Sequence, residues 1–375
     1  MIRLSKSSIN DNEKQAVLSV LDREYLGMGK DVGEFEDKLA SFFNRSVVCT
    51  NSGTSALQLA VQSAGIGEGD EVLVQSLTFV ACFQAVSATG AIPIPCEILP
   101  NTFTIDLEDA AEKLNKRTKA IMPVHYSGGA GDLAAVYRFA EDHGLRVIED
   151  ASHGFGTIYE GKLLGSFGDT ACFSFDGIKN ITCGEGGVIV SSDSALLEKA
   201  SDLRLLGVKG DTKKRFEGRR SWKFDVDGQG WRYHMSNINA AIGAAQLDRY
   251  PEFKKKRQDL AQRYLRKLAE IPLVRTLALD YSQVVPHIFV IRLDDRLDRD
   301  GLIDFLEMRG IQTGLHYYPN HRLEFFNPGY RYSLPITDYL FDHILTIPLH
   351  TDLTYEEQDI VIAELAKYCN CGSKA

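Results

Sequence analysis

Residues 173–187 read FSFDGIKNITCGEGG, and this stretch decides how the rest of the chain is interpreted. It predicts an apolar strand that ends at Phe175, a polar loop with Lys179 as its single lysine, and a Gly-Glu-Gly-Gly turn that opens the next strand. A lysine at the end of a buried strand is unusual, because desolvation opposes its charge. The same desolvation makes its amine a good nucleophile for a carbonyl carbon. In an arbitrary loop, a lysine that reaches solvent would be the simpler interpretation, so the surrounding residues must decide.

Around this stretch, short apolar strands alternate with helices. The expected strands are residues 47–50, 71–75, 91–95, 119–124, 145–148, 169–175 and 187–191, and the expected helices between them include 51–63, 80–89 and 132–143. Repeated strand–helix–strand units indicate a mostly parallel sheet between helices, and hence an α/β fold. Sheets of this kind bind ligands at the carboxyl ends of their strands.

The pattern of expected helices and strands changes near Pro251. The expected elements there are a charged helix to about residue 271, a strand at 288–293, helices at 300–309 and 355–368, and an extended segment at 313–318. We therefore predict a large α/β domain over residues 1–248, which includes an N-terminal helical segment, and a smaller C-terminal α+β domain over residues 249–375. The end of the chain, residues 372–375, is expected to be loose.

The composition is that of an ordinary globular protein, with 375 residues, 44% of them hydrophobic and 25% charged. A formal net charge of −9 opposes bulk binding of nucleic acid, although local donors can still hold a small anion. The basic cluster at residues 254–257 is expected on a solvated helix face. No run of roughly 18 apolar residues predicts a membrane span, and the N-terminus lacks an apolar signal core. Seven scattered cysteines at irregular spacing indicate a reducing compartment, the cytoplasm, and no metal site.

Two further segments place polar residues at strand ends. Asp150 follows an apolar strand, where an acid can pair with a pyridinium nitrogen. Taken alone, Asp150 could equally cap the next segment. Residues 51–56 read NSGTSA and form a turn before a helix, where backbone N–H groups and the helix dipole favour a phosphate. Taken alone, this turn could be an ordinary helix cap.

Together and in this order, the three segments resemble the DegT/StrS family of nucleotide-sugar aminotransferases that depend on pyridoxal phosphate (PLP). This family belongs to the aspartate-aminotransferase fold, known as PLP fold type I. The resemblance covers nearly the whole chain, from about Gly27 to the C-terminal helix. Its most specific part is the stretch at residues 173–187, and residues 76–79 (SLTF) and 240–247 (AAIGAAQL) support it.

The resemblance assigns cofactor-binding roles to residues already singled out. Lys179 would carry the cofactor and move protons, and Asp150 would pair with the pyridine nitrogen. Phe79 would stack on the face of the cofactor ring, and His153 would lie near the ring hydroxyl. The phosphate would be held by Gly53, Thr54 and Ser174. In the C-terminal part, residues 316–321 resemble the substrate loop of the family, so His316, Tyr317 and His321 are expected to bind substrate.

One segment departs from the family pattern. Many relatives have Gly-Tyr-Asn-Tyr-Arg-Met, whose Asn reaches the phosphate of the neighbouring subunit's cofactor. Here residues 230–235 read GWRYHM, so Arg232 replaces the Asn and His234 replaces the Arg. Because an arginine also binds phosphate, often bidentately, Arg232 is expected to make this contact across an obligate homodimer.

The resemblance implies a transamination in two halves. L-glutamate would leave as 2-oxoglutarate, the cofactor would become pyridoxamine phosphate (PMP), and a keto-sugar would then receive the amino group. Residues 179–187 look like those of members that aminate C4. The expected acceptor is therefore a 4-keto-6-deoxyhexose linked to dTDP or UDP. The product would be a 4-amino-4,6-dideoxy sugar, such as dTDP-4-amino-4,6-dideoxyglucose, for a lipopolysaccharide O-antigen or a similar surface polysaccharide.

Two alternatives stay open. One is a member of the family that aminates C3, and another is a non-catalytic regulator that binds PLP or a sugar on the same fold. A sugar dehydratase of the family would carry His in place of Lys179. A dinucleotide-dependent sugar oxidoreductase would need Gly-x-Gly-x-x-Gly after an early strand, and the spacing of Gly27, Gly29 and Gly33 does not provide it.

Overall fold

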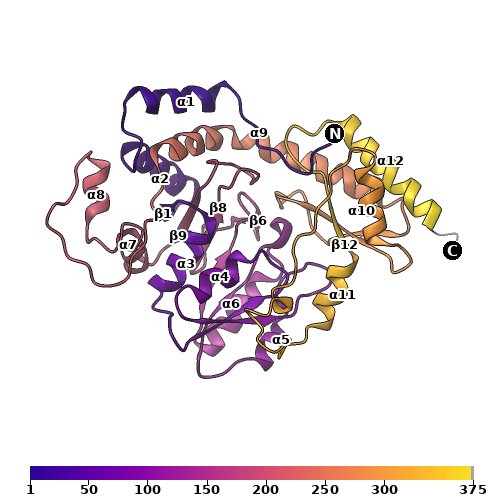
Figure 1. Ribbon diagram of the computed structural model, residues 1–375, viewed down its shortest axis with the longest axis horizontal. Helices are drawn as coiled ribbons and strands as arrows, with labels where there is room; N and C mark the ends of the chain where they lie inside the picture. Colours follow the sequence, from indigo (N-terminus) through magenta and orange to yellow (C-terminus); the bar gives the residue numbers. More distant parts are fainter. Residues whose placement is uncertain (373–375) are drawn as a thin grey trace.

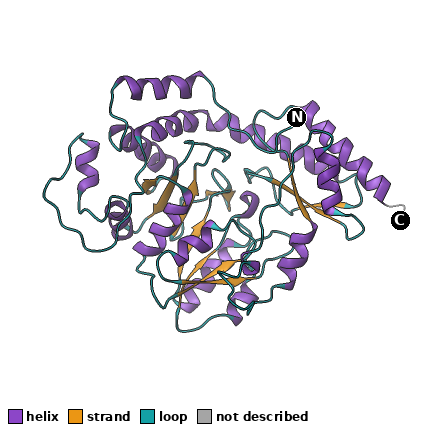
Figure 2. Cartoon of the chain, in the orientation of Figure 1, coloured by secondary structure: helices purple, strands orange, loops and turns teal. Residues whose placement is uncertain are grey.

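A seven-stranded sheet forms the centre of the computed structural model, which describes residues 1–372 (Figure 1, Figure 2). Residues 373–375, the end of the segment expected to be loose, lie outside the described part. The strand order is β1-β9-β8-β5-β4-β2-β3. The strands are β1 (Ser46–Thr50), β2 (Glu71–Gln75), β3 (Ile92–Cys96), β4 (Thr118–Met122), β5 (Arg146–Asp150), β8 (Thr170–Ser174) and β9 (Gly187–Ser191). Strand β9 is antiparallel to both of its neighbours, whereas β8, β5, β4, β2 and β3 are parallel, so the predicted α/β fold is confirmed.

Helices cover both faces of this sheet because its strands are apolar on both sides. Val72 and Val74 pack into the core on one face, while Leu73 between them packs into the core on the other. One face is covered by α3 (Gly53–Ser63), α4 (Ala81–Ser87) and α7 (Ser194–Leu203). The opposite face is covered by α2 (Lys30–Phe43), α5 (Leu107–Glu112), α6 (Leu133–His143) and the first half of α9 (Asn237–Leu268).

Two smaller features extend this part of the molecule. Helix α1 (Asp11–Asp22) lies along α9 (Figure 1), and a short hairpin joins β6 (Ile158–Tyr159) to β7 (Lys162–Leu163). Helix α8 (Asp211–Phe216) and the loop after it extend away from the body at the left of the view (Figure 1).

The C-terminal part has its own core around a three-stranded antiparallel sheet. The strands are β10 (Val274–Thr276), β11 (Phe289–Leu293) and β12 (Ile344–Ile347), and the helices are α10 (Arg299–Glu307), α11 (Pro335–His343) and α12 (Tyr355–Gly372). A separate apolar cluster joins this part to the large sheet region, since Phe103 and Tyr126 pack there with Ile288 and Phe341. Among the described residues, no helix is both long and apolar enough to cross a membrane.

Helix α9 differs from the sequence prediction. A new helix was expected to begin near Pro251, but the structure has one helix of 32 residues that passes through Pro251. A proline inside a helix removes one i→i−4 hydrogen bond, and burial on both sides of it offsets that loss. Tyr250 and Phe253 pack into the core under the large sheet, and Leu260 and Tyr264 pack into the C-terminal core.

Arg257 is also a correction. The cluster at residues 254–257 was expected to be a solvated helix face, but Arg257 is only 2% exposed. Its guanidinium donates to the carbonyl oxygens of Pro286 and His287, at 3.2 and 3.1 Å. Burial lowers the pKa of this guanidinium to about 10. The sequence pattern alone could not reveal these contacts, because they lie 29 and 30 residues away along the chain.

Candidate active site

The polar segments at the strand ends meet in one cavity, which we call the Lys179 cavity. Its volume is about 390 Å³, within the range of roughly 300–1,000 Å³ that is typical of small-molecule sites. Most of the residues singled out from the sequence line it: Gly53, Thr54, Phe79, Asp150, His153, Ser174, Lys179, His316 and Tyr317. The sheet places them together because the carboxyl ends of its parallel strands meet at one edge.

Lys179 lies in the loop between β8 and β9. Asp176 shapes this loop, since its carboxylate accepts from the Ile178 N–H at 3.2 Å and its carbonyl accepts from the Lys179 N–H at 3.1 Å. Burial lowers the pKa of the Lys179 amine to about 8, although the nearby carboxylates of Asp150 and Asp176 oppose this shift. The amine therefore has a large neutral fraction near pH 8, which a nucleophile or a general base requires.

Asp150 ends β5 and is 5% exposed. Its Oδ1 accepts from the backbone N–H of Ser152 at 3.0 Å, and its Oδ2 accepts from the Cys82 thiol at 2.9 Å. These two bonds fix the orientation of the carboxylate. A carboxylate held in this way can stabilise a positive charge in a bound ligand.

The N-terminus of α3 borders the same cavity. Ser52 caps this helix through a capping box with Ser55, which leaves the N–H groups of Gly53 and Thr54 at the first turn. A Cβ on Gly53 would lie 2.7 Å from the Cβ of Ser174, so the glycine lets the Ser174 hydroxyl approach the helix end. Helix dipole, backbone N–H groups and hydroxyl together form a site for an anionic group such as a phosphate.

Aromatic and histidine side chains form another wall of the cavity. The ring of Phe79 is 53% exposed and lies 5.4 Å from the ring of Tyr317, centroid to centroid. The His153 Nε2 is 2.9 Å from the hydroxyl of Tyr317. His316 contacts Thr346 through Nδ1 at 2.9 Å. Burial, reinforced by the charge of Lys179, lowers the pKa of His316 to about 4, so this ring is neutral at physiological pH.

Two predicted residues do not line the Lys179 cavity. His321 is buried, with Nδ1 at 2.8 Å from the Ser76 hydroxyl and Nε2 at 3.1 Å from Asp338, so its ring links the segment after β2 to α11. His321 therefore does not line the Lys179 cavity, and the substrate-binding role predicted for it stays a prediction. Arg232 is exposed and forms an isolated bridge with Leu205. The contact predicted for Arg232 crosses to a second subunit and stays a prediction.

Two residues at the site were not foreseen. His287 approaches Lys179, with 3.4 Å between Nε2 and Nζ. Cys82 bonds to Asp150, although a cysteine in an apolar helix is normally interpreted as a small hydrophobe. A usable signal existed for His287, since it interrupts the apolar run at residues 284–291 just where a strand begins. No comparable signal marks Cys82.

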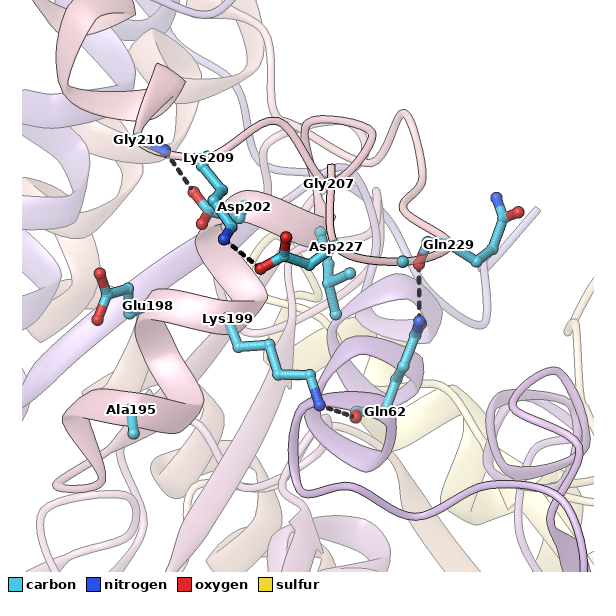
Figure 3. A pocket seen from close by; sticks show the side chains of 12 residues that line it. Gln62, Ala195, Glu198, Lys199, Asp202, Gly207, Lys209, Gly210, Asp227 and Gln229 are labelled. Carbon is cyan, nitrogen blue, oxygen red and sulfur yellow. Dashed lines mark hydrogen bonds and ion pairs between the residues drawn. The ribbon is translucent and has the colours of Figure 1, made fainter. Parts of the chain in front are cut away.

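A second cavity, of about 600 Å³, lies beside α7, and we call it the α7 cavity (Figure 3). Several of its charged and polar side chains pair with one another or with backbone. Lys199 donates to the Gln62 carbonyl at 3.2 Å, Gln62 donates to the Gln229 carbonyl at 2.8 Å, and Lys209 pairs with Asp227 (Figure 3). These contacts engage both lysines of the α7 cavity.

Similar solved structures define the class of the protein. The chain is similar to the aminotransferase TlmJ from Streptoalloteichus hindustanus, with 30% identity, 100% of both chains covered and a TM-score of 0.91. It is also similar to the sugar aminotransferase CalS13 from Micromonospora echinospora, with 29% identity, 98% of this chain and 100% of that chain covered, and a TM-score of 0.88. A third is the PMP-form of Spr1654 from Streptococcus pneumoniae, with 26% identity, coverage of 99% and 100%, and a TM-score of 0.92.

These likenesses identify an α/β enzyme of the aminotransferase class. The model of the DegT/DnrJ/EryC1/StrS aminotransferase family matches residues 7–366. The chain therefore belongs to that family, which confirms the resemblance, the fold class and the enzyme class predicted from the sequence.

Proposed function

We propose that this enzyme uses PLP to transfer the amino group of L-glutamate to a nucleotide-linked 4-keto-6-deoxyhexose. The observation that carries the proposal is that the Lys179 amine and the fixed Asp150 carboxylate line one cavity beside the N-terminus of α3. The product is a 4-amino-4,6-dideoxy sugar on dTDP or UDP, made in the cytoplasm for a surface polysaccharide such as O-antigen.

The residues of the cavity fit PLP. The N-terminus of α3 with the Ser174 hydroxyl suits its phosphate, and Asp150 suits its pyridine nitrogen. His153 supplies a further argument, since its Nδ1 is buried and has no hydrogen-bond partner among the described residues. A buried polar atom of this kind is costly unless a ligand satisfies it. Spr1654, which has the same fold, has been solved in PLP- and PMP-forms.

Each residue of the Lys179 cavity then has a separate role in the transamination. Bound PLP supplies an electron sink beside the carbon that loses or gains the amino group. The Lys179 amine would take the proton from the α-carbon of glutamate and pass it to the cofactor carbon that keeps the amino group. On the sugar side it would move a proton the other way, from that carbon to the sugar carbon that gains the amino group. The carboxylate of Asp150 holds the ring nitrogen in its charged form. His316 and Tyr317 face the cavity from the C-terminal part and bind the keto-sugar.

Support for amination at C4 comes from residues 179–187. The motif Lys-Asn-Ile-Thr…Gly-Glu-Gly-Gly resembles that of C4-aminating members, and its Asn180 also has a structural role. The Asn180 amide donates to the carbonyl oxygens of Phe155 and Val285, at 3.1 and 3.2 Å, and so ties the Lys179 loop to the C-terminal part. Amination at C3 is the alternative, and the choice of acceptor in the assay below tests it.

We further propose that the enzyme is an obligate homodimer with shared active sites. The loop after α8 exposes large apolar side chains, with Trp222 at 88% and Phe224 at 62% exposure, on the segment that extends from the body (Figure 1). Exposed apolar groups that cluster in this way are typical of protein interfaces. Arg232, a short distance further along the chain, would reach the cofactor phosphate of the second subunit. A monomer with full activity in sedimentation and assay would contradict this proposal.

The visible absorption spectrum of the PLP-loaded protein tests the function. We expect the cofactor's absorption band to disappear with L-glutamate and to return with dTDP-4-keto-6-deoxyglucose, and Lys179→Ala to lack this band. Parallel additions of the UDP-linked sugar and of a 3-keto isomer identify the nucleotide and the carbon. If glutamate converts the band and only the 3-keto sugar restores it, amination at C4 is wrong. If the wild-type protein never acquires the band, the role of Lys179 is wrong.

A further inference from the structure

His287 comes from the C-terminal part of the chain and yet lies next to Lys179. It immediately precedes Ile288 and β11, it is 2% exposed, and its Nε2 lies 3.4 Å from the Lys179 Nζ. Its ring packs at a tilt against the ring of His153, with 4.5 Å between ring centroids. His287 is thus a polar contact that the C-terminal part makes with the reactive amine itself.

The backbone on both sides of this contact is held by one side chain. Arg257 of α9 donates from Nη1 to the carbonyl oxygens of Pro286 and His287, and from Nη2 to the carbonyl oxygen of Lys179 at 3.5 Å. Because the guanidinium is planar and its donors are fixed relative to one another, it holds the two backbone segments at a set distance. The approach of His287 to Lys179 is therefore built into the fold.

The imidazole of His287 can serve only as a neutral partner. Burial, together with the charge of Lys179, holds the pKa of His287 well below its usual value. A neutral imidazole has one N–H and one lone pair. With the proton on Nδ1, Nε2 presents its lone pair to the Lys179 amine, which is always a hydrogen-bond donor. We assign this tautomer because its Nε2 lone pair can accept from the amine in both protonation states, whereas the other tautomer would point an N–H at the ammonium form. The Nδ1 atom of His287 is buried and has no hydrogen-bond partner among the described residues.

We propose that His287 is a positioning residue for Lys179, which accepts a hydrogen bond from the Lys179 amine at Nε2 and holds that amine at the edge of the cavity. The imidazole is a much weaker base than the amine, so it orients the amine without taking its proton. This inference rests on the proposed function, in which Lys179 must act as an amine that is not bound to the cofactor for part of the cycle.

Other groups also act on the charge of Lys179, and the test must separate them from His287. Asp150 on β5, Asp176 in the same loop and Cys82 on α4 favour the ammonium form, while Arg257 on α9 opposes it. The neutral rings of His153 and His316 lie nearby as well. A substitution at His287 leaves all of these residues in place, so a change in the behaviour of the amine can be assigned to position 287.

Two variants separate positioning from packing. His287→Gln keeps an acceptor near the position of Nε2, whereas His287→Phe fills the space without one. We expect kcat to fall about tenfold in the Phe variant, the loss expected for one hydrogen bond, with the sugar KM unchanged. We expect the Gln variant to retain most of the wild-type kcat. Thermal unfolding of both variants measures any loss of folding.

A second readout does not depend on turnover. Cofactor-free protein is mixed with PLP at pH 6 to 10, and the rate at which the absorption band appears is followed. Removing an acceptor destabilises the ammonium, so the midpoint of this profile should move to lower pH in the Phe variant and stay near the wild-type value in the Gln variant. Equal losses in both variants with unchanged midpoints would overturn the inference, as would a Phe variant that behaves like the wild type. A wild-type protein that never forms the band would instead overturn the proposed function.

Discussion

The Lys179 cavity and the α7 cavity differ in what surrounds their lysines. The α7 cavity is the larger, at about 600 Å³ against about 390 Å³, but its Lys209 is exposed and pairs with Asp227. That hydrogen bond raises the pKa of Lys209, whereas burial lowers the pKa of Lys179 to about 8. Desolvation without a close ion-pair partner creates a reactive amine, and the size of a cavity does not.

The origin of this difference lies in the fold. Lys179 follows a strand of the central sheet, so the segments after β1, β2 and β5 enclose it with a carboxylate, a helix N-terminus and aromatic rings. Lys209 follows α7 at the surface, where water and a nearby carboxylate satisfy its charge. Matched substitutions in the two cavities therefore test whether the surroundings of Lys179 make it reactive.

The largest expected difference is in kcat, between variants of the carboxylates Asp150 and Asp227. Asp150→Asn keeps the shape of the side chain and removes the charge that would hold the pyridine nitrogen. We expect kcat to fall by about 10²–10³-fold, as for other losses of a preorganised electrostatic contact. Asp227→Asn in the α7 cavity is the matched control and should change kcat less than twofold, because exposed ion pairs contribute about 0–1 kcal/mol. Equal activity of the two variants in steady-state assays would contradict the assignment of Asp150.

A difference of intermediate size is expected in the rate at which PLP labels Lys179 and Lys209, and in how that rate depends on pH. When cofactor-free protein is exposed to PLP and then reduced with borohydride, peptide mapping should find the label on Lys179 and not on Lys209. Since only the neutral amine reacts, the labelling rate should rise about tenfold per pH unit below the pKa of about 8 and level off above it. Labelling of Lys209 at a comparable rate would show that the environment of Lys179 is not special.

The smallest expected difference is in the free energy of unfolding, between alanine substitutions at Gly187 and Gly228. A Cβ on Gly187 would lie 2.3 Å from the carbonyl oxygen of Ser52, next to the N-terminus of α3, whereas a Cβ on Gly228 in the α7 cavity would meet nothing within 4 Å. We expect Gly187→Ala to lower the free energy of unfolding by about 1–3 kcal/mol and to weaken PLP binding. Gly228→Ala should change the free energy of unfolding by less than about 0.5 kcal/mol. Denaturant titrations of both variants check this, and a destabilised Gly228→Ala would undermine the contrast.

Much of the fold and part of the site follow from local patterns. The apolar strands and their helices are placed within a few residues, because each alternation of apolar and turn-forming residues is a local property. The convergence of Asp150, Gly53 and Lys179 on one cavity also follows, since parallel strands bring their carboxyl ends to one edge.

The features that could not be predicted depend on contacts far apart in sequence. His287 meets Lys179 across 108 residues, and Cys82 meets Asp150 across 68. The burial of Arg257 and the continuity of α9 through Pro251 both depend on the C-terminal part packing against the end of that helix. A pattern limited to neighbouring residues carries no information on such packing.

The continuity of α9 limits how this chain can be recombined with its relatives. At about 1.5 Å per residue, the helix is roughly 48 Å long and runs through both cores. A chimera joined at residues 248/249, the boundary predicted from the sequence, would place its seam inside this helix. One inserted or deleted residue there would rotate the second half by about 100° relative to the first. Arg257 would then lose its three carbonyl partners, so an exchanged C-terminal part must preserve the helical phase.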